Sequence, residues 1–170
     1  GDIPITEAAK NGHEARIQLL LDRGANISKR GDIGLVTLHW AIRLKKMILF
    51  NFSLDRGADI SSRGYRSFTP LLFAAGVNNT NITKILLERG ADITAKDFSG
   101  YTPLLRAVSE GLVSMAEILL DAGSDIQAEN KSSNTPLHLA ANGRNSAMVL
   151  LLLRRGAERE ARNKYGNTPL

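Results

Sequence analysis

The chain of 170 residues contains no cysteine. This absence excludes a disulfide framework, a thiolate nucleophile and a cysteine-ligated zinc site, and it favours an intracellular protein, cytoplasmic or nuclear. Long apolar runs are missing as well. A stretch such as Met148 to Leu153 is far too short to cross a bilayer, and no basic segment followed by an apolar one opens the chain. We therefore expect a soluble protein that does not bind membranes.

Aromatic residues make up only 5% of the chain, and acidic residues are outnumbered by basic ones, 17 against 22. The resulting net charge of +5 favours an acidic partner over a basic one. Much of this excess lies between Arg154 and Lys164, where basic residues outnumber acidic ones. With 43% hydrophobic and 23% charged residues, the composition is that of a folded globular protein.

What the sequence does contain is an internal repeat with a period of 33 residues. The tripeptide Thr-Pro-Leu occurs at regular intervals, beginning at Thr69, Thr102, Thr135 and Thr168. Blurred copies stand one and two periods earlier, at residues 36–38 and 3–5. A fixed period of this length is typical of a solenoid, in which one supersecondary unit stacks on the next.

The unit that begins at Thr102 shows what each repeat builds. Thr102 can accept hydrogen bonds from free backbone amides, and Pro103 fits the first helical position, so a helix is predicted to begin there. Gly111 ends that helix, and a second apolar set at helical spacing over residues 113–120 predicts another. Gly123 then closes the second helix, and the following residues predict a loop that doubles back. Because a helix pair leaves one apolar side open, the units must stack.

Further motifs recur in register with Thr-Pro-Leu. They are Thr-Pro-Leu-His with an Ala-Ala pair at residues 135–141, Gly-His at 12–13, three leucines at 19–21 and Gly-Ala-Asp at 57–59. The period and these motifs closely resemble those of the ankyrin repeat family, over the full length of the chain. The resemblance implies an all-α helical solenoid, a right-handed stack of helix-turn-helix units with projecting β-hairpin loops. It also implies a concave face of hairpin tips and first helices on which such proteins hold their partners.

The period divides the chain into repeats of a single domain. They are predicted at residues 3–35, 36–68, 69–101, 102–134 and 135–167, with a sixth starting at 168–170. We expect the chain to be part of a longer array or a larger protein.

The second repeat departs most from the pattern. Thr37 replaces the proline, Lys45 the glycine between the helices, and Ser53 the middle leucine of the second helix. Losing a buried leucine costs about 2–5 kcal/mol where the site cannot collapse, although the neighbouring phenylalanines can fill part of the gap. We predict low local stability for residues 36–57.

No residue pattern predicts catalysis, a cofactor or a metal site. Each of the three histidines, His13, His39 and His138, stands at a family position, so a structural role accounts for it, and their spacing does not suit metal ligation. Residues 31–34 contain two glycines but lack the Lys-Ser/Thr of a phosphate-binding loop. We expect a non-catalytic protein without a cofactor.

A partner surface is predicted from residues whose identity the repeat does not set, at the loop tips and on the solvent side of the first helices. We call the first position of each Thr-Pro-Leu motif, and the equivalent Val36, the Thr slot. Six positions before it most residues are basic, and five of the nine aromatic residues of the chain lie within four positions before it. Arginine and aromatic side chains dominate interface energetics, so we interpret this pattern as a strip that docks an acidic protein or peptide. The predicted partner-binding residues are Arg30, Asp32, Arg43, Arg63, Tyr65, Arg66, Phe68, Lys96, Phe98, Tyr101, Glu110 and Tyr165.

Simpler and competing interpretations stay open at this point. The basic residues could only solvate the loops while the aromatic residues shield neighbouring hairpins. Beyond a monomeric protein-protein interaction module or scaffold, the array could be a regulatory or structural spacer of a larger multidomain protein. Nucleic-acid binding is least favoured, because Asp32, Glu110 and Glu129 interrupt the basic strip.

Overall fold

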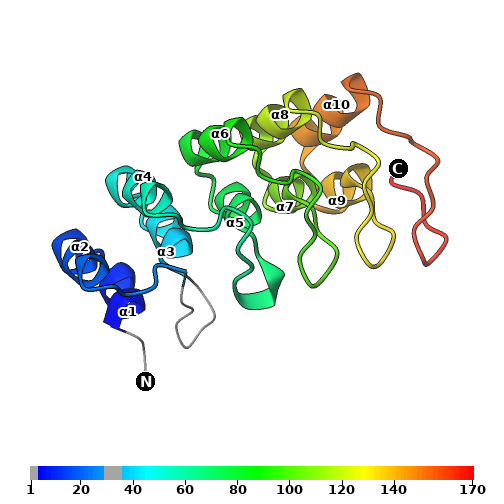
Figure 1. Cartoon of the computed structure of the whole chain (residues 1–170). Helices are drawn as coiled ribbons and strands as arrows, with labels where there is room; N and C mark the ends of the chain where they lie inside the picture. Colours follow the sequence, from blue (N-terminus) through cyan, green and yellow to red (C-terminus); the bar gives the residue numbers. More distant parts are fainter. Residues whose placement is uncertain (1–3, 29–35) are drawn as a thin grey trace.

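The computed structural model describes residues 4–28 and 36–170, in which ten α-helices follow one another as antiparallel pairs. The first helices of the pairs form one layer and the second helices form another (Figure 1). The first layer contains α1 (Pro4–Lys10), α3 (Thr37–Arg43), α5 (Pro70–Gly76), α7 (Pro103–Ser109) and α9 (Pro136–Asn142). The second layer contains α2 (Glu14–Asp22), α4 (Met47–Asp55), α6 (Thr80–Glu88), α8 (Val113–Asp121) and α10 (Ser146–Arg154). The predicted helical solenoid is confirmed.

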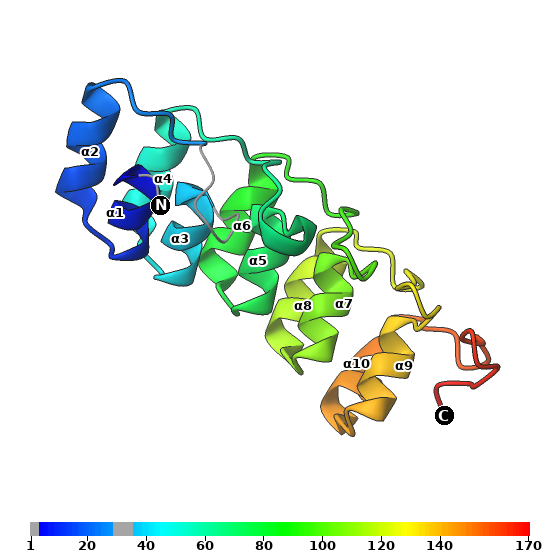
Figure 2. The same ribbon diagram turned by 90° about the horizontal axis from the view of Figure 1, so that it is seen from below.

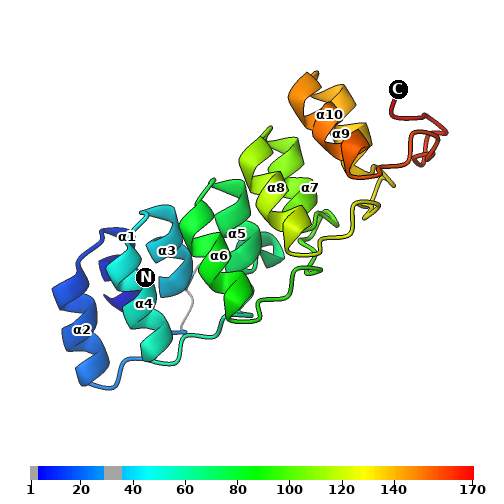
Figure 3. The ribbon, with the colours of Figure 1, turned by 90° about the horizontal axis from the view of Figure 1, so that it is seen from above.

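The pairs succeed one another along the molecule, and the segments that connect the second pair to the third, the third to the fourth and the fourth to the fifth run along the same side of the stack (Figures 2 and 3). Neighbouring first helices pack against each other from α1 to α9. This arrangement brings equivalent residues of successive repeats into rows, so that a position in one repeat can be compared directly with the same position in the next.

The Thr-Pro pair starts the first helices as predicted. The Oγ1 atoms of Thr69 and Thr102 each accept a backbone N–H from the residue three positions later, at 3.2 Å. In α9 the cap is reciprocal, since the ring of His138 also accepts the backbone N–H of Thr135 at 3.3 Å. Each bond satisfies an amide that has no partner within the helix, and this places the helix start at the threonine.

Left-handed backbone follows each helix of a pair. The glycine after the second helix has φ between 80° and 89° in Gly24, Gly57, Gly90, Gly123 and Gly156. The position between the paired helices also has positive φ, from 52° to 71°, in Gly12, Lys45, Asn78, Gly111 and Arg144. The fold thus keeps a left-handed turn between the helices even where the residue is not glycine.

The core lies between stacked pairs. The leucine of each Thr-Pro-Leu motif is fully buried in Leu71, Leu104 and Leu137, and so is the middle leucine of the second helix in Leu86, Leu119 and Leu152. Fully burying a leucine contributes about 1.5–3 kcal/mol, so these rows hold the stack together. Alanines at Ala74, Ala107 and Ala140 are buried as well and let neighbouring helices approach closely.

The second repeat fills its core in a different way. Ser53 is fully buried where other repeats have leucine, and its Oγ donates to the carbonyl of Leu49 at 2.6 Å. Phe50, three residues earlier on the same helix face, is also fully buried. Its counterparts are the smaller Ile17, Thr83, Ala116 and Val149. In the second repeat a large residue and a small one, Phe50 and Ser53, thus occupy the positions at which the later repeats have a smaller residue and a leucine.

The loops that follow α4, α6, α8 and α10 project beside the first-helix layer and stand in a row (Figure 1). Each doubles back through a backbone bond from an N–H to the carbonyl four residues later. These bonds run from Gly64 to Phe68, Asp97 to Tyr101, Asn130 to Asn134 and Asn163 to Asn167, at 2.8–3.2 Å. Such a short closure does not extend into a ladder, and within residues 4–28 and 36–170 no β-strand forms. The loops therefore have hairpin shape without paired strands.

Candidate binding surface

The tips of these loops lie side by side and are joined by backbone hydrogen bonds. The N–H of Phe98 donates to the carbonyl of Arg66 at 2.9 Å, and Lys131 N–H donates to Ser99 at 3.1 Å. The N–H of Lys164 bonds the tip before it in the same way. We call residues 64–67, 97–100, 130–133 and 163–166 the tip row. Because the backbones are linked, the tip row is an elongated surface of fixed spacing.

A side-chain oxygen shapes three of the four tips. Oδ1 of Asp97, Asn130 or Asn163 accepts the backbone N–H groups two and four residues later, at 2.7–3.1 Å. The equivalent residue of the second repeat is Gly64, which has no side chain to do this. Its loop forms a 3₁₀ turn instead, η1 (Tyr65–Ser67), in which Arg66 and Ser67 have positive φ. The loop that lacks this side-chain oxygen thus has a different shape from the other three.

Aromatic side chains stand out from the tip row into solvent. Tyr65 is 60% exposed, Phe98 70% and Tyr165 77%. The Nζ atom of Lys131 lies 4.5 Å from the centre of the Phe98 ring, and the guanidinium of Arg66 lies 5.6 Å from that of Tyr65. Exposed cations and aromatic rings thus lie close to one another along the tip row.

The exposed charge of the tip row is positive. The only acidic residue in its four segments is Asp97, whose side chain is just 2% exposed. The basic residues of the same segments, Arg66, Lys131 and Lys164, are all exposed. An anionic partner would therefore meet no exposed carboxylate on the tips.

Two predicted docking residues, Phe68 and Tyr101, lie at the loop bases rather than at the tips. Both are half-buried, and the guanidinium of Arg106 from α7 lies between their rings, 5.1 Å from Phe68 and 4.6 Å from Tyr101. Arg106 also forms an ion pair with Asp97. The ring of Phe73 on α5 extends this cluster edge-on, 6.2 Å from Phe68. These contacts give both aromatic residues a packing role within the protein.

The basic residues six positions before the Thr slot connect adjacent loops. Nη1 of Arg63 donates to the carbonyl of Lys96 at 3.0 Å, and Nζ of Lys96 donates to the carbonyl of Glu129 at 2.9 Å. Arg162 donates instead within its own loop, to Gly166. Arg63 and Lys96 remain exposed, but their side chains are already used to hold the loops in register.

A carboxylate below the tips has a shifted pKa. The hydroxyl and backbone N–H of Thr94 donate to Oδ1 of Asp92 at 2.7 and 2.9 Å. These two bonds, with a smaller contribution from the positive charge of Arg63, hold the pKa of Asp92 below its ordinary value. Asp92 is therefore ionised at neutral pH and supports the turn that leads into the loop.

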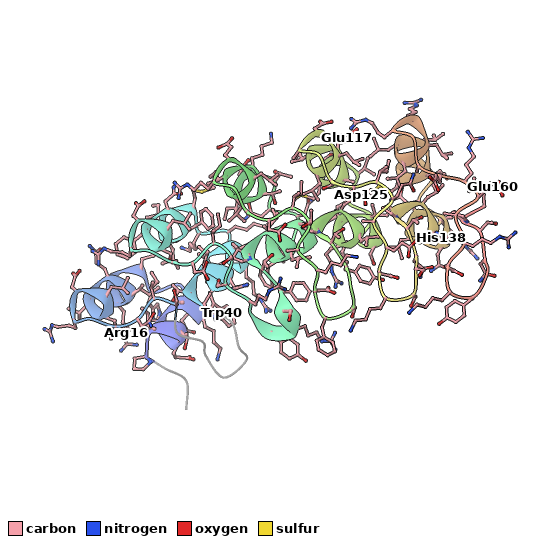
Figure 4. The ribbon with its side chains drawn as sticks, turned by 45° about the vertical axis from the view of Figure 1, so that its right-hand side comes forward. Arg16, Trp40, Glu117, Asp125, His138 and Glu160 are labelled. Atoms are coloured by element: carbon pink, nitrogen blue, oxygen red, sulfur yellow. The ribbon has the colours of Figure 1, made fainter. Side chains whose placement is uncertain are left out.

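The remaining predicted residues are less close to the tips. Arg43 ends α3 and lies with its guanidinium 5.5 Å from the ring of Trp40, which Figure 4 shows on the first-helix side. Glu110 is exposed just after α7. Since the loops join the first helices at their N-termini, both residues lie about one seven-residue helix away, roughly 10 Å. Arg30 and Asp32 lie outside the described residues.

Sequence reasoning missed four residues of this surface, Lys131, Lys164, Arg106 and Asp97. Lys131 stands four positions before its Thr slot, in register with Tyr65 and Phe98, and counting at that position would have found it. Arg106 stands where α3, α5 and α9 carry an aromatic or apolar residue. An arginine at this helix position, with an aspartate nine residues earlier in the preceding loop, is the sequence pattern that could have indicated the ion pair.

Two histidines, His39 and His138, join successive repeats. Nε2 of His138 lies 3.0 Å from the carbonyl of Asn167, and its Nδ1 lies 2.9 Å from Oγ1 of Thr135. Figure 4 shows His138 on α9, facing the last loop. His39 contacts the carbonyl of Phe68 in the same way, at 3.0 Å. The two rings that bridge repeats thus have the structural role predicted for them.

Among residues 4–28 and 36–170, no three His, Asp or Glu side chains gather in a geometry that could hold a metal ion. In the same residues, no helix is both long enough and apolar enough to cross a membrane.

Comparison with protein-family models gives three matches along the chain. A model described as ankyrin repeats in three copies matches residues 38–130. A second, for ankyrin repeats in many copies, matches residues 119–170, and a single ankyrin repeat matches residues 1–32. The first match alone covers more than half of the chain. A comparison with curated proteins found no match to this sequence.

Proposed function

We propose that this chain, which belongs to the ankyrin repeat family, is a non-catalytic module that binds an acidic protein or peptide through the tip row. Arrays of this family generally act as protein-interaction modules and are typically non-catalytic. One observation carries the proposal. The tips expose aromatic rings beside cations and expose no carboxylate. Aromatic and basic side chains of this kind supply most of the energy of many protein interfaces.

The electrostatics of the tip row favour an anionic partner. Arg66, Lys131 and Lys164 are free of carboxylate neighbours on the tips, whereas Arg106 is neutralised by Asp97 behind them. Positive charge on the rim of an interface steers an acidic partner toward it and disfavours a basic one.

A protein partner fits this pattern better than a nucleic acid does. Proteins that bind single strands follow the phosphate backbone with a continuous basic groove. Here Arg63 and Lys96 already donate to backbone carbonyls, and Glu129 interrupts the row that they belong to. The cations left on the tips are separate points, which suit individual carboxylates.

The test is selection of peptides from a displayed library of random dodecapeptides, using the whole chain as the target. We expect the selected peptides to be enriched in Asp and Glu. A variant with Arg66→Glu, Lys131→Glu and Lys164→Glu should bind them at least about tenfold more weakly, because charge attraction becomes repulsion.

The matched control reverses as many charges on the second-helix layer, with Lys84→Glu, Arg89→Glu and Arg154→Glu. These side chains are also exposed, and the net charge changes equally. Selected peptides that lose affinity equally for both variants would show that only total charge matters, and the proposal would fail. It would fail as well if selection gave no acidic peptides.

A further inference from the structure

The tip of the third repeat, like that of the fourth, is bonded through its backbone to the tips on both sides of it. Its N-terminal side is tied to the second repeat by the bond from Phe98 N–H to Arg66, at 2.9 Å. Its C-terminal side is tied to the fourth repeat by the bond from Lys131 N–H to Ser99, at 3.1 Å. The fourth tip is tied in the same way on its other side, by the bond from Lys164 N–H to Ser132.

Bonds behind this tip fix its conformation further. Oδ1 of Asp97 accepts the N–H groups of Ser99 and Tyr101, at 2.7 and 3.0 Å, while its other oxygen pairs with Arg106. The guanidinium of Arg106 is in turn held between Phe68 and Tyr101. The backbone around the residue next to Asp97 is therefore held by bonds to the tips on both sides and by the bonds that Asp97 accepts within its own loop.

That residue is Phe98, and 70% of its side chain is exposed. A phenylalanine in water gains nothing from burial, and its contact with Lys131 at an exposed site is worth little to the stability of the fold. The equivalent positions in the next two repeats are lysines. The fold therefore does not require an aromatic ring here, yet holds one in a fixed, central and solvated position.

We propose that Phe98 is the anchor of the tip row, and that it binds an apolar side chain of an extended acidic peptide while Arg66 and Lys131 pair with carboxylates on either side of that residue. This inference rests on the proposed function and adds the position of the anchor and the order of residues in the ligand.

The order follows from the arrangement of the tips. Arg66 and Lys131 belong to the tips on either side of Phe98, which the backbone bonds hold next to it. A peptide that touches all three must run along the row, so it must be extended. An anchor on a rigid backbone loses little conformational freedom on binding, which is why such residues dominate the affinity of an interface.

The sequence of such a peptide has a definite pattern. An aromatic or aliphatic residue lies against Phe98, and Asp or Glu residues lie on both sides of it. Nζ of Lys131 already lies 4.5 Å from the centre of the Phe98 ring. A peptide carboxylate next to the apolar residue can therefore pair with Lys131 while the ammonium group stays against the ring.

The experiment uses the dodecapeptides selected on the whole chain and measures their dissociation constants for two aromatic variants. Phe98→Ala should weaken binding roughly tenfold or more, as truncation of an anchor does. Tyr165→Ala is the matched control, because Tyr165 is also a tip aromatic and is exposed even more, at 77%. It should change binding by less than about threefold. Equal thermal unfolding of the three proteins would show that neither change alters the fold.

The possible results separate the anchor from the proposed function. Acidic peptides that carry a central apolar residue and depend on Phe98 but not on Tyr165 support the inference. Acidic peptides that respond to the tip charge reversal but not to Phe98→Ala overturn the anchor and leave the proposed function intact. Selection of no acidic peptide overturns both, and so does tighter binding of oligothymidylate than of any peptide, with a steep dependence on salt.

Discussion

The second and third repeats are neighbours with the same backbone plan, but they are stabilised differently. At the start of the first helix, the hydroxyl of Thr69 caps α5, whereas Val36 gives α3 no side-chain cap. At the start of the second helix, Asn79 caps α6, whereas Lys46 gives α4 none. Asn79 also donates from Nδ2 to the carbonyl of Ile42, in the second repeat, at 3.3 Å.

This difference shows that one repeat can keep the fold with few local stabilising bonds of its own. The second repeat relies on the buried ring of Phe50 and on hydrogen bonds with its neighbour, such as those between Asn79 and Ile42 and between Arg63 and Lys96. In a stacked array each repeat gains much of its stability from the interface with the next one. The sequence of one repeat can therefore depart from the pattern of the family while packing and hydrogen bonds with the neighbouring repeats keep its fold.

The largest effect should come from Phe50, because it takes the place of the missing leucine. Phe50→Ala should lower the free energy of unfolding by about 3–5 kcal/mol, as removal of a buried ring does. The double substitution Phe50→Thr with Ser53→Leu introduces the residues of the third repeat at both positions. It should lower the free energy of unfolding by less than the sum of the two single substitutions, because the side-chain volume lost at residue 50 is regained at residue 53. Urea unfolding of the unsubstituted chain, the two single variants and the double variant measures this coupling. Simple additivity would contradict the idea that the two residues compensate for each other's volume.

Asp97 should come next, because its removal makes the third-repeat loop resemble the second, where Gly64 holds this position. Asp97→Ala leaves the guanidinium of Arg106 without its carboxylate and frees two backbone amides, and we expect a loss of about 3 kcal/mol. Asp97→Asn is the informative control. Asn130 accepts the same pair of backbone bonds in the fourth repeat, so this variant should keep the loop and lose only the ion pair. Equal losses for the two variants in denaturant unfolding would assign the whole effect to charge.

The sequence predicted the fold well because its signals are local and recur. Threonine caps, glycines after the second helices and buried leucines recur at the same position in most repeats, so one misread repeat does not mislead the others. The cluster around Arg106 could not be predicted in this way. It joins Asp97, Phe68 and Tyr101 from two loops to a helix, and none of its members recurs at the same position in every repeat. The use of Arg63 and Lys96 as links between loops depends on side-chain reach, which spacing alone does not reveal.

Amide hydrogen exchange can test the comparison without any substitution. The two caps of the third repeat are each typically worth about 1 kcal/mol, so helices α3 and α4 should open at a free energy about 2 kcal/mol below that of α5 and α6. Residues 36–57 should then exchange faster than residues 69–90 in the intact chain. The exposed loops serve as the fast-exchanging reference, and uniform protection of all four helices would contradict a weaker second repeat.

The smallest effect should come from the turn between the paired helices. Lys45 has φ of 55°, a left-handed conformation that costs a residue with a side chain about 1–2 kcal/mol. Glycine avoids this cost but loses more freedom on folding, so Lys45→Gly should stabilise the chain by about 0.5–1 kcal/mol in thermal unfolding. Gly12→Lys makes the opposite change in the first repeat, where φ is 68° and a Cβ would meet Leu44 at an ordinary contact distance of 3.5 Å. It should destabilise by a similar amount. If both variants shifted stability in the same direction, backbone conformation would not be what distinguishes these turns.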